Sequence, residues 1–310
     1  MKMVLSDEAR SLLQGSYDLH IHSAPDLMPR KSNDLGFARR AATAGMAGIL
    51  VKSHFTSTAD RAALVSEVVP DVRVYGALCL NHSSGGINPI AAETAGRSGA
   101  RLVWFPTVDA RNELEHMDRY KGISTPFWYT IAQELRAEGM AREPIYLLNE
   151  DGKLLPEVYQ VLDVIAKYDM ILATGHIGIE EIRVLVKAAK GAGVRRIVLT
   201  HPDLPSIKMP FDLQAELAKQ GVLMERTYMI NFSGKVTLDY TFAATRAAGV
   251  AGTLLSTDFG QPKSPWPDEG FGEFIQHFLD AGFTRDEVRT MVYDNPAGLV
   301  NGSCHRISAS

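Results

Sequence analysis

An acid and two histidines occupy alternate positions near the start of the sequence, Asp18, His20 and His22 in the run SYDLHIHSAPD. The run around them is short and apolar, which indicates a β-strand, and alternate side chains of a strand point to one face. Two imidazoles and a carboxylate on one face could grip one metal ion, and such ligands suit zinc, manganese, iron or nickel. Two hydrogen-bonded histidines in an ordinary strand are the alternative.

Polar side chains also stand where the other short apolar runs of the chain end. Six of the nine histidines fall at such ends, which chance scatter would not favour. In a barrel of parallel strands the carboxyl ends of the strands surround the active site, so these residues are expected to meet there. The set comprises His20, His22, Lys52, His54, Asn81, His82, His176, His201 and Asp258.

Asp258 ends the last of these runs, LLSTDFG, and is a candidate for proton transfer. A catalytic metal ion lowers the pKa of a bound water and polarises a substrate oxygen. A carboxylate beside that water can accept its proton and later pass it to the leaving group. The alternative for Asp258 is the N-cap of a helix that follows the strand.

The elements that must position these residues alternate regularly along the chain. Eight short apolar, β-branched runs are predicted as strands, at residues 17–22, 47–54, 72–81, 101–107, 170–177, 195–202, 221–228 and 252–260. Segments with helical periodicity lie between them, so βαβ units and a parallel sheet are expected. Eight such units predict an α/β fold, a (β/α)8 TIM barrel. A doubly wound open sheet is the competitor, but HSAP stands where its Gly-rich phosphate loop is usually found.

One gap, after the fourth predicted strand, is clearly longer than the others. It contains a predicted helix over 124–140 and two extended arms around an Asp-Gly turn at 145–158. No polar, low-complexity linker borders it, so we predict an insertion at approximately 107–150 within a single domain of residues 1–310. Because the insertion leaves from the mouth of the barrel, it is a candidate lid over the site.

The order of the strand-end residues resembles the amidohydrolase superfamily, which places H-x-H after strand 1, single histidines after strands 5 and 6, and an aspartate after strand 8. The likeness runs over nearly the whole chain, and YDNPAGLVNGS resembles the closing helix of many such enzymes. It implies that His20, His22, His176 and Asp258 bind a metal and that Asp258 shuttles protons. It also implies that His201 binds a second metal or contacts the substrate or the water. More closely, VKSHF, LNHSSGGINP, PTVDA and ATGHI resemble an uncharacterised amidohydrolase-like family.

The chain departs from that superfamily at strand 4, where dinuclear members usually carry a carboxylated lysine. Here the strand end reads LVWFPT, so we expect one tightly held metal and leave a second open. Lys52, on strand 2, is either a carboxylated ligand, an ammonium that binds a substrate carboxylate or carbonyl, or the partner of a neighbouring aspartate. Glu225, on strand 7, either adds an extra carboxylate to the site or pairs with a nearby arginine.

Composition limits the partners of the protein. The chain has 310 residues, 22% of them charged, and a formal net charge of −4 without a basic block, so no nucleic-acid partner is expected. No apolar stretch approaches the roughly 18 residues of a membrane span, so no membrane partner is expected either. The N-terminus reads as a short amphipathic helix and not as a signal peptide, and the two cysteines form no disulfide framework, which predicts a cytoplasmic protein.

We therefore predict an amidohydrolase-type, metal-dependent hydrolase that cleaves an amide, cyclic amide, lactone or ester bond of a small molecule by metal-activated water. Zinc is the expected cofactor, with manganese, iron or nickel as alternatives. Arg30, Lys52, His54 and Asn81 are candidates to orient the substrate, and a homo-oligomer is left open. One alternative is a metal-dependent decarboxylase of a small carboxylic acid, and another is a barrel that binds metal or ligand without turnover.

Overall fold

Parallel β-strands form the interior of the structure, a computed structural model that describes residues 3–301 apart from 124–125, 127 and 141. The strands form two parallel sheets, of order β1-β2-β3 and β4-β5-β6-β7-β8-β9. Their bounds are β1 (Tyr17–His22), β2 (Gly48–Lys52), β3 (Arg73–Tyr75), β4 (Ala77–Cys79), β5 (Leu102–Trp104), β6 (Ile171–Ala173), β7 (Ile197–Leu199), β8 (Val222–Thr227) and β9 (Thr253–Ser256). β1 and β2 are buried along their whole length, as strands covered on both faces are.

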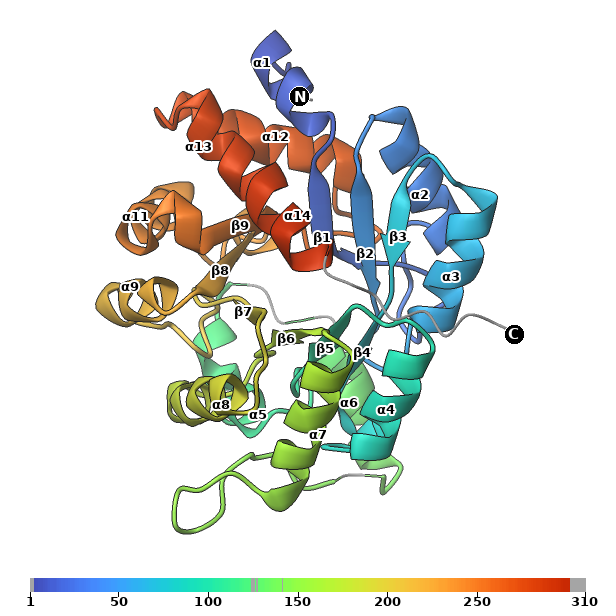
Figure 1. Cartoon of the computed structure of the whole chain (residues 1–310), viewed down its shortest axis with the longest axis vertical. Coiled ribbons are helices and arrows are strands. Elements are labelled where there is room, and N and C mark those ends of the chain that lie inside the picture. Colours follow the sequence, from blue (N-terminus) through green and yellow to red (C-terminus); the bar gives the residue numbers. More distant parts are fainter. Residues whose placement is uncertain (1–2, 124–125, 127, 141, 302–310) are drawn as a thin grey trace.

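Helices lie around the outside of the strands (Figure 1). α8 shows why they pack there, because Ile182, Leu185, Val186 and Ala189 form a buried stripe with the spacing of an amphipathic helix. The helices are α1 (Asp7–Leu13), α2 (Asp34–Thr43), α3 (Ala59–Val68), α4 (Pro89–Arg97), α5 (Arg111–Glu115), α6 (Trp128–Ala137), α7 (Pro156–Lys167), α8 (Ile179–Gly191), α9 (Phe211–Lys219), α10 (Tyr228–Phe232), α11 (Leu238–Ala248), α12 (Pro267–Asp280), α13 (Arg285–Arg289) and α14 (Asn295–Val300).

The two sheets close into one barrel. β3 and β4 are the two halves of a single barrel strand, separated only by Gly76. A side chain at Gly76 would meet the Cα of Ala59 at 2.4 Å, so this position requires glycine because the start of α3 lies against it. At the other seam, His22 N–H donates to Phe259 O at 2.7 Å and joins β1 to the segment after β9. The predicted (β/α)8 barrel is confirmed by this closure.

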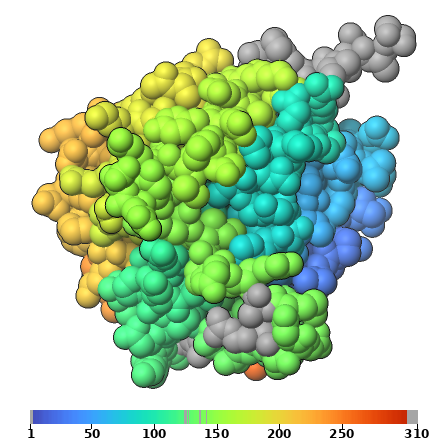
Figure 2. All heavy atoms as spheres, turned by 90° about the horizontal axis from the view of Figure 1, so that it is seen from below, coloured from blue at the N-terminus to red at the C-terminus, as the bar shows by residue number. Residues whose placement is uncertain are grey.

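The insertion lies between β5 and α7 and contributes α5 and α6. The helix predicted over 124–140 is observed as α6, and residues 124, 125 and 127 lie outside the described part of the chain. The two predicted extended arms meet in one antiparallel bridge between Leu148 and Leu154, and Asn149 N–H donates to Lys153 O at 2.8 Å across the turn. Figure 2 shows the green part of the chain, which includes the insertion, over the centre and the lower edge of this face.

The two ends of the described chain are helical, as predicted. The amphipathic N-terminal segment forms α1, and the closing segment forms α14, beyond which residues 302–310 are not described. Among the helices that the structure describes, none combines the length and the apolar character that crossing a membrane requires.

Candidate active site and metal centre

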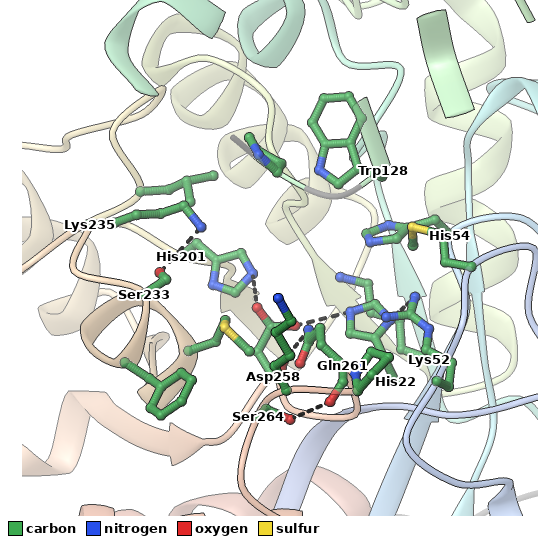
Figure 3. Close-up of a pocket in the computed structure, with 18 of the residues that line it drawn as sticks. His22, Lys52, His54, Trp128, His201, Ser233, Lys235, Asp258, Gln261 and Ser264 are labelled. Carbon is green, nitrogen blue, oxygen red and sulfur yellow. Dashed lines mark hydrogen bonds and ion pairs between the residues drawn. The ribbon is translucent and has the colours of Figure 1, made fainter. Parts of the chain in front are cut away.

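A cavity opens at the carboxyl ends of the strands, where the sequence predicts the active site. Its volume is about 540 Å³. In Figure 3, His201 and Asp258 lie between Lys52 on one side and Lys235 on the other. The predicted site residues in its wall are His22, Arg30, Lys52, His54, His176, His201 and Asp258. His20 is fully buried behind this wall.

Asp258 is the point at which the histidines converge. Its Oδ1 lies 3.2 Å from His20 Nε2 and 3.0 Å from His22 Nε2, and its Oδ2 lies 3.7 Å from His201 Nε2. The ligand atoms of His20, His201 and Asp258 all lie within 4.8 Å of one another, which is close enough to hold one metal ion. Three protein ligands and one open position are typical of catalytic zinc sites.

Two of these three side chains project from a strained backbone. His201 (φ 48°) and Asp258 (φ 56°) are left-handed, a conformation that residues other than glycine rarely adopt. Such strain costs of the order of 1–3 kcal/mol and is concentrated at functional sites. His201 Nδ1 lies 3.2 Å from Thr227 Oγ1, which leaves its Nε2 directed at Asp258. The two turns therefore aim both side chains at a common point.

Glu225 sets the orientation of His20. Its Oε1 lies 3.1 Å from His20 Nδ1, and both side chains are buried. When Glu225 is ionised, the single proton of a neutral imidazole lies on Nδ1, and the Nε2 lone pair faces Asp258 Oδ1. Two acceptors at 3.2 Å repel each other unless a cation lies beside them, and in this structure the Lys52 ammonium, 2.9 Å from His20 Nε2, is that cation. The alternative that Glu225 pairs with an arginine is wrong, because the adjacent Arg226 bonds to Asp203 at 2.6 Å.

Burial keeps the histidines of the cavity neutral. It lowers the pKa of His20 to about 3, with the Lys52 charge acting in the same direction, and it holds the pKa of His22, His176 and His201 well below the usual value. Neutral imidazoles are the form that binds metal ions. Within the described residues, both ring nitrogens of His176 are buried without a hydrogen-bond partner. This set of donors fits a divalent metal ion.

His22 is held differently from His20. Arg30 Nη2 donates to His22 Nδ1 at 3.2 Å and to Asp26 Oδ2 at 3.1 Å. A neutral His22 ring then carries its proton on Nε2 and donates it to Asp258. Metal binding through Nε2 requires this proton to leave, so the ligand role of His22 stays a prediction. Arg30, a candidate to orient the substrate, lines the cavity and also fixes His22.

Lys52 lies against His20 in the wall of the cavity. Its Nζ is 2.9 Å from His20 Nε2 and 4.5 Å from the centre of the Trp104 ring. None of the described carboxylates lies within 4 Å of Lys52 Nζ, so the alternative of a structural pair with an aspartate is not observed. Burial lowers the pKa of Lys52. Because the ammonium occupies the His20 lone pair that a metal would use, Lys52 must turn away or lose a proton when a metal binds.

Asp18 braces the barrel seam and does not join the cluster. It accepts hydrogen bonds from Thr257 N–H at 3.0 Å and from Thr257 Oγ1 at 2.5 Å, directly beside Asp258. β1 has a register irregularity between Asp18 and Ile21, which interrupts the alternation expected from D-x-H-x-H. Asp18 therefore fixes the turn that carries Asp258.

Asn81 supports the cavity wall from behind. Its amide nitrogen donates to His54 O at 2.9 Å and to Thr107 Oγ1 at 2.7 Å, and its carbonyl accepts from Thr107 N–H at 2.9 Å. The side chain is fully buried and is not among the residues that line the cavity, so these bonds give Asn81 a structural role, and its substrate contact stays a prediction. The His54 ring does line the cavity, 4.8 Å from the ring of His22, and stays a candidate to orient the substrate.

Comparison with known protein families assigns the chain to one of them. Residues 15–225 match a family described as "Family of unknown function (DUF6282)". The chain belongs to this family. The matched segment holds His20, Lys52, His201 and Glu225, whereas Asp258 lies beyond it. A search of the curated proteins finds no match.

Solved structures share the fold of this DUF6282 member. An amidohydrolase from Pseudomonas aeruginosa matches with a TM-score of 0.59 and 11% identity, over 94% of this chain and 98% of that chain. An organophosphorus hydrolase from Deinococcus radiodurans matches with a TM-score of 0.57 and 14% identity, over 97% of each chain. A 2,6-dihydroxybenzoate decarboxylase from Rhizobium matches with a TM-score of 0.52 and 13% identity, over 93% of this chain and 98% of that chain. The resemblance to the amidohydrolase superfamily is thereby confirmed at the level of the fold.

Sequence reasoning does not identify three further charged residues of the cavity wall, Glu113, Lys235 and the exposed Lys263. Glu113, on α5, accepts hydrogen bonds from Tyr120 OH at 2.9 Å and from Ser206 Oγ, and its Oε2 lies 3.7 Å from His176 Nδ1. Burial raises the pKa of Glu113 to about 7. Each residue lies in the connection that follows a barrel strand, β5, β8 or β9, and this position is the signal that could have identified it.

Proposed function

We propose that this DUF6282 member is a metal-dependent hydrolase that cleaves an amide, cyclic amide, lactone or ester bond of a small molecule. The convergence of ligand atoms from His20, His201 and Asp258 within 4.8 Å, at the mouth of the barrel, carries this proposal. These three residues would hold one divalent ion, and zinc suits the donor set. When bound, such an ion lowers the pKa of a water and polarises a substrate oxygen.

Asp258 is the proton carrier in this reaction. Its side chain is 15% exposed, whereas that of Glu225 is 3% exposed, so Asp258 is the carboxylate of the cluster that a substrate can reach. It accepts a proton from the attacking water and returns it to the leaving nitrogen or oxygen. Its backbone N–H donates to His20 O at 2.8 Å, which holds the carboxylate in place during the transfer.

The remaining wall of the cavity serves substrate binding. Arg30 supplies positive charge on one side of the cavity, and Lys52 adds to it once it turns away from His20. The insertion contributes Tyr120 and Trp128, which supports its role as a cover that excludes bulk water. Nearby charges stabilise the developing negative charge on a substrate carbonyl more strongly in such a site than they would in water.

The test uses the Asp258→Asn variant and the substrate found by screening metal-loaded protein against lactones, cyclic imides, amides and phosphoesters. Asparagine keeps the size of the side chain but removes its basicity, so kcat should fall by about 10²-fold or more. Metal content is measured on the same samples, because Asp258 is also a candidate ligand. Asp151→Asn, a change at an exposed turn of the insertion, is the matched control. A fully metallated Asp258→Asn variant with near-normal kcat would exclude the proton-transfer role.

The product decides between the proposed hydrolysis and its alternatives. Incorporation of ¹⁸O from labelled water into the product supports hydrolysis. Released CO₂ would assign the chain to a decarboxylase instead. Metal binding without turnover across the panel, including small carboxylic acids, would favour a barrel that binds a ligand without a reaction.

A further inference from the structure

Lys235 presents a positive charge to the cavity without a carboxylate to balance it. It lies in the loop between α10 and α11, is half-buried, and lines the cavity opposite Lys52 (Figure 3). Its Nζ lies 3.3 Å from Ser233 Oγ and 5.9 Å from the centre of the Tyr120 ring. Across the described ranges of the chain, no carboxylate approaches Lys235 Nζ within 4 Å. A charge that is withdrawn from water without a counter-ion destabilises the protein unless a ligand supplies one.

The surroundings of Lys235 are apolar. Leu204, Met229 and Phe232 line the same cavity. Burial lowers the pKa of Lys235, and the more distant charges of Asp258 and Glu113 oppose this effect. The other buried cations of the cavity are already engaged, Arg30 with Asp26 and Lys52 with His20. Lys263 also lines the cavity, but it is exposed to water. Lys235 is therefore the half-buried lysine of this wall that has no carboxylate partner among the described residues.

We propose that Lys235 binds a carboxylate group of the substrate. The Ser233 hydroxyl, which donates to Ile230 O at 3.3 Å in this structure, turns to add a second hydrogen bond. One ammonium and one hydroxyl match a singly charged carboxylate, whereas a phosphate group would call for more donors, such as an arginine fork. The bond to be cleaved must lie beside Asp258, so an apolar spacer that contacts Met229 and Phe232 separates it from the carboxylate. The substrate class is then a small apolar carboxylic acid that also carries an amide, lactone or ester bond, and this assignment rests on the proposed hydrolase function.

The experiment measures binding and needs no turnover. Benzoate, phenylacetate and 3-phenylpropionate are titrated into metal-loaded protein by calorimetry, each beside the alcohol that shares its apolar part. We expect the best carboxylate to bind about tenfold or more tightly than its alcohol, because a charged hydrogen bond contributes that much. Lys235→Met should lose this preference while its affinity for the alcohol stays within about twofold, and Lys235→Arg should keep the preference. Lys187→Met removes the same charge from the exposed side of α8 and should change neither constant.

Two outcomes would overturn the assignment. One is a carboxylate affinity that is equal in wild type and Lys235→Met. This result is expected if the metal ion alone binds the carboxylate, or if no carboxylate binds better than its alcohol. The other is an equal loss for carboxylate and alcohol, which would mean that Lys235 only shapes the wall. Melting temperature and metal content of Lys235→Met are measured to show that the variant is folded and loaded. The protein could bind carboxylates through Lys235 and yet hydrolyse none of the test substrates. That result would contradict the hydrolase proposal but would still support the carboxylate site at Lys235.

Discussion

Glu225 acts on the metal centre through the ring of His20. Its carboxylate lies on Nδ1 of that ring, on the far side from Asp258. Burial raises the pKa of Glu225 to about 8, and a cation on the other ring nitrogen favours the ionised carboxylate. A carboxylate behind a ligating histidine fixes the tautomer and makes the ring a stronger ligand. The metal affinity of the site should therefore depend on a residue that does not touch the metal.

Glu225→Gln should weaken metal binding by about 10- to 100-fold, because the amide accepts the His20 proton less strongly than a carboxylate. Competition with a fluorescent chelator measures the dissociation constant of the metal. Glu216→Gln, on the exposed side of α9, is the matched control and should bind metal like wild type. Equal affinity in Glu225→Gln and wild type would show that the hydrogen bond to His20 has no influence on the ion.

Lys52→Gln separates the two alternatives that the structure leaves for this lysine. If Lys52 is an ammonium that orients an anionic or carbonyl-bearing substrate, KM should rise by about tenfold with constant metal content, since one charged hydrogen bond is lost. The measurement combines steady-state kinetics on the identified substrate with metal analysis of the same protein. A loss of metal that short-chain carboxylates reverse would instead identify a carboxylated lysine, and unchanged kinetics with unchanged metal would exclude both roles.

At the scale of the elements, β8 directs two adjacent charges to opposite sides of the barrel wall. Alternate residues of a strand point to opposite faces, so Glu225 reaches inward to His20 while Arg226 points outward. Arg226, fully buried, donates to Asp203 at 2.6 Å, to Gln214 Oε1 at 2.7 Å and to the backbone of α11. This network joins β8 to the loop after β7 and to α9. The loop carries His201, so the same network supports the metal centre from outside.

Asp203→Ala should lower the free energy of unfolding by about 3–5 kcal/mol, because it leaves the buried Arg226 guanidinium without its counter-ion. Urea unfolding measures the change. Glu216→Ala breaks the ion pair between Glu216 and Arg183, and both of these side chains are more than half exposed. This variant should lower the free energy of unfolding by no more than about 1 kcal/mol. A similar cost for both variants would show that the Arg226 network adds nothing beyond an ordinary surface ion pair.

At the scale of the whole molecule, the candidate metal centre lies across the seam that closes the barrel. His20 comes from β1, and Asp258 follows β9, the last strand. These strands meet through backbone hydrogen bonds, and Asp18 adds two bonds to Thr257 at the same place. A metal bound by His20 and Asp258 would connect the first and last strands of the barrel. Binding should therefore stabilise the folded chain as a whole.

Removal of metal with a chelator should lower the Tm of protein isolated under metal-replete conditions by several degrees. A ligand bound only by the folded state stabilises it by about 4 kcal/mol when its free concentration is a thousand times the dissociation constant. His20→Ala should lose most of the metal, and its Tm should not respond to the chelator. His277→Ala changes a histidine that bonds to Tyr228 outside the cluster and should respond like wild type. If wild-type protein holds no metal and its Tm does not change with the chelator, the proposed metal centre is wrong.

Much of the architecture could be predicted from the sequence because the signals are local. Strand and helix periodicity extends over a few residues, and the alternation of eight such units is sufficient to predict the barrel. Residues at the ends of the predicted strands then had to meet at one end of it. His20, His201 and Asp258 were placed in this way, and the structure brings them together. The same regular alternation of strands and helices locates the insertion, because the alternation is interrupted there.

The side-chain partners were decided only by the tertiary structure, because they depend on distances between segments that are far apart in the chain. Parity on β8 indicates that Glu225 faces inward, but only the packing shows that His20 receives its hydrogen bond. A register irregularity in β1 turns Asp18 to Thr257, and no local pattern signals it. Lys235 lies in a connection that follows a barrel strand, but only the closed barrel shows that its side chain lines the cavity. The sequence by itself determined which polar residues stand at the strand ends, and the fold determined which of them line the cavity and which of them touch.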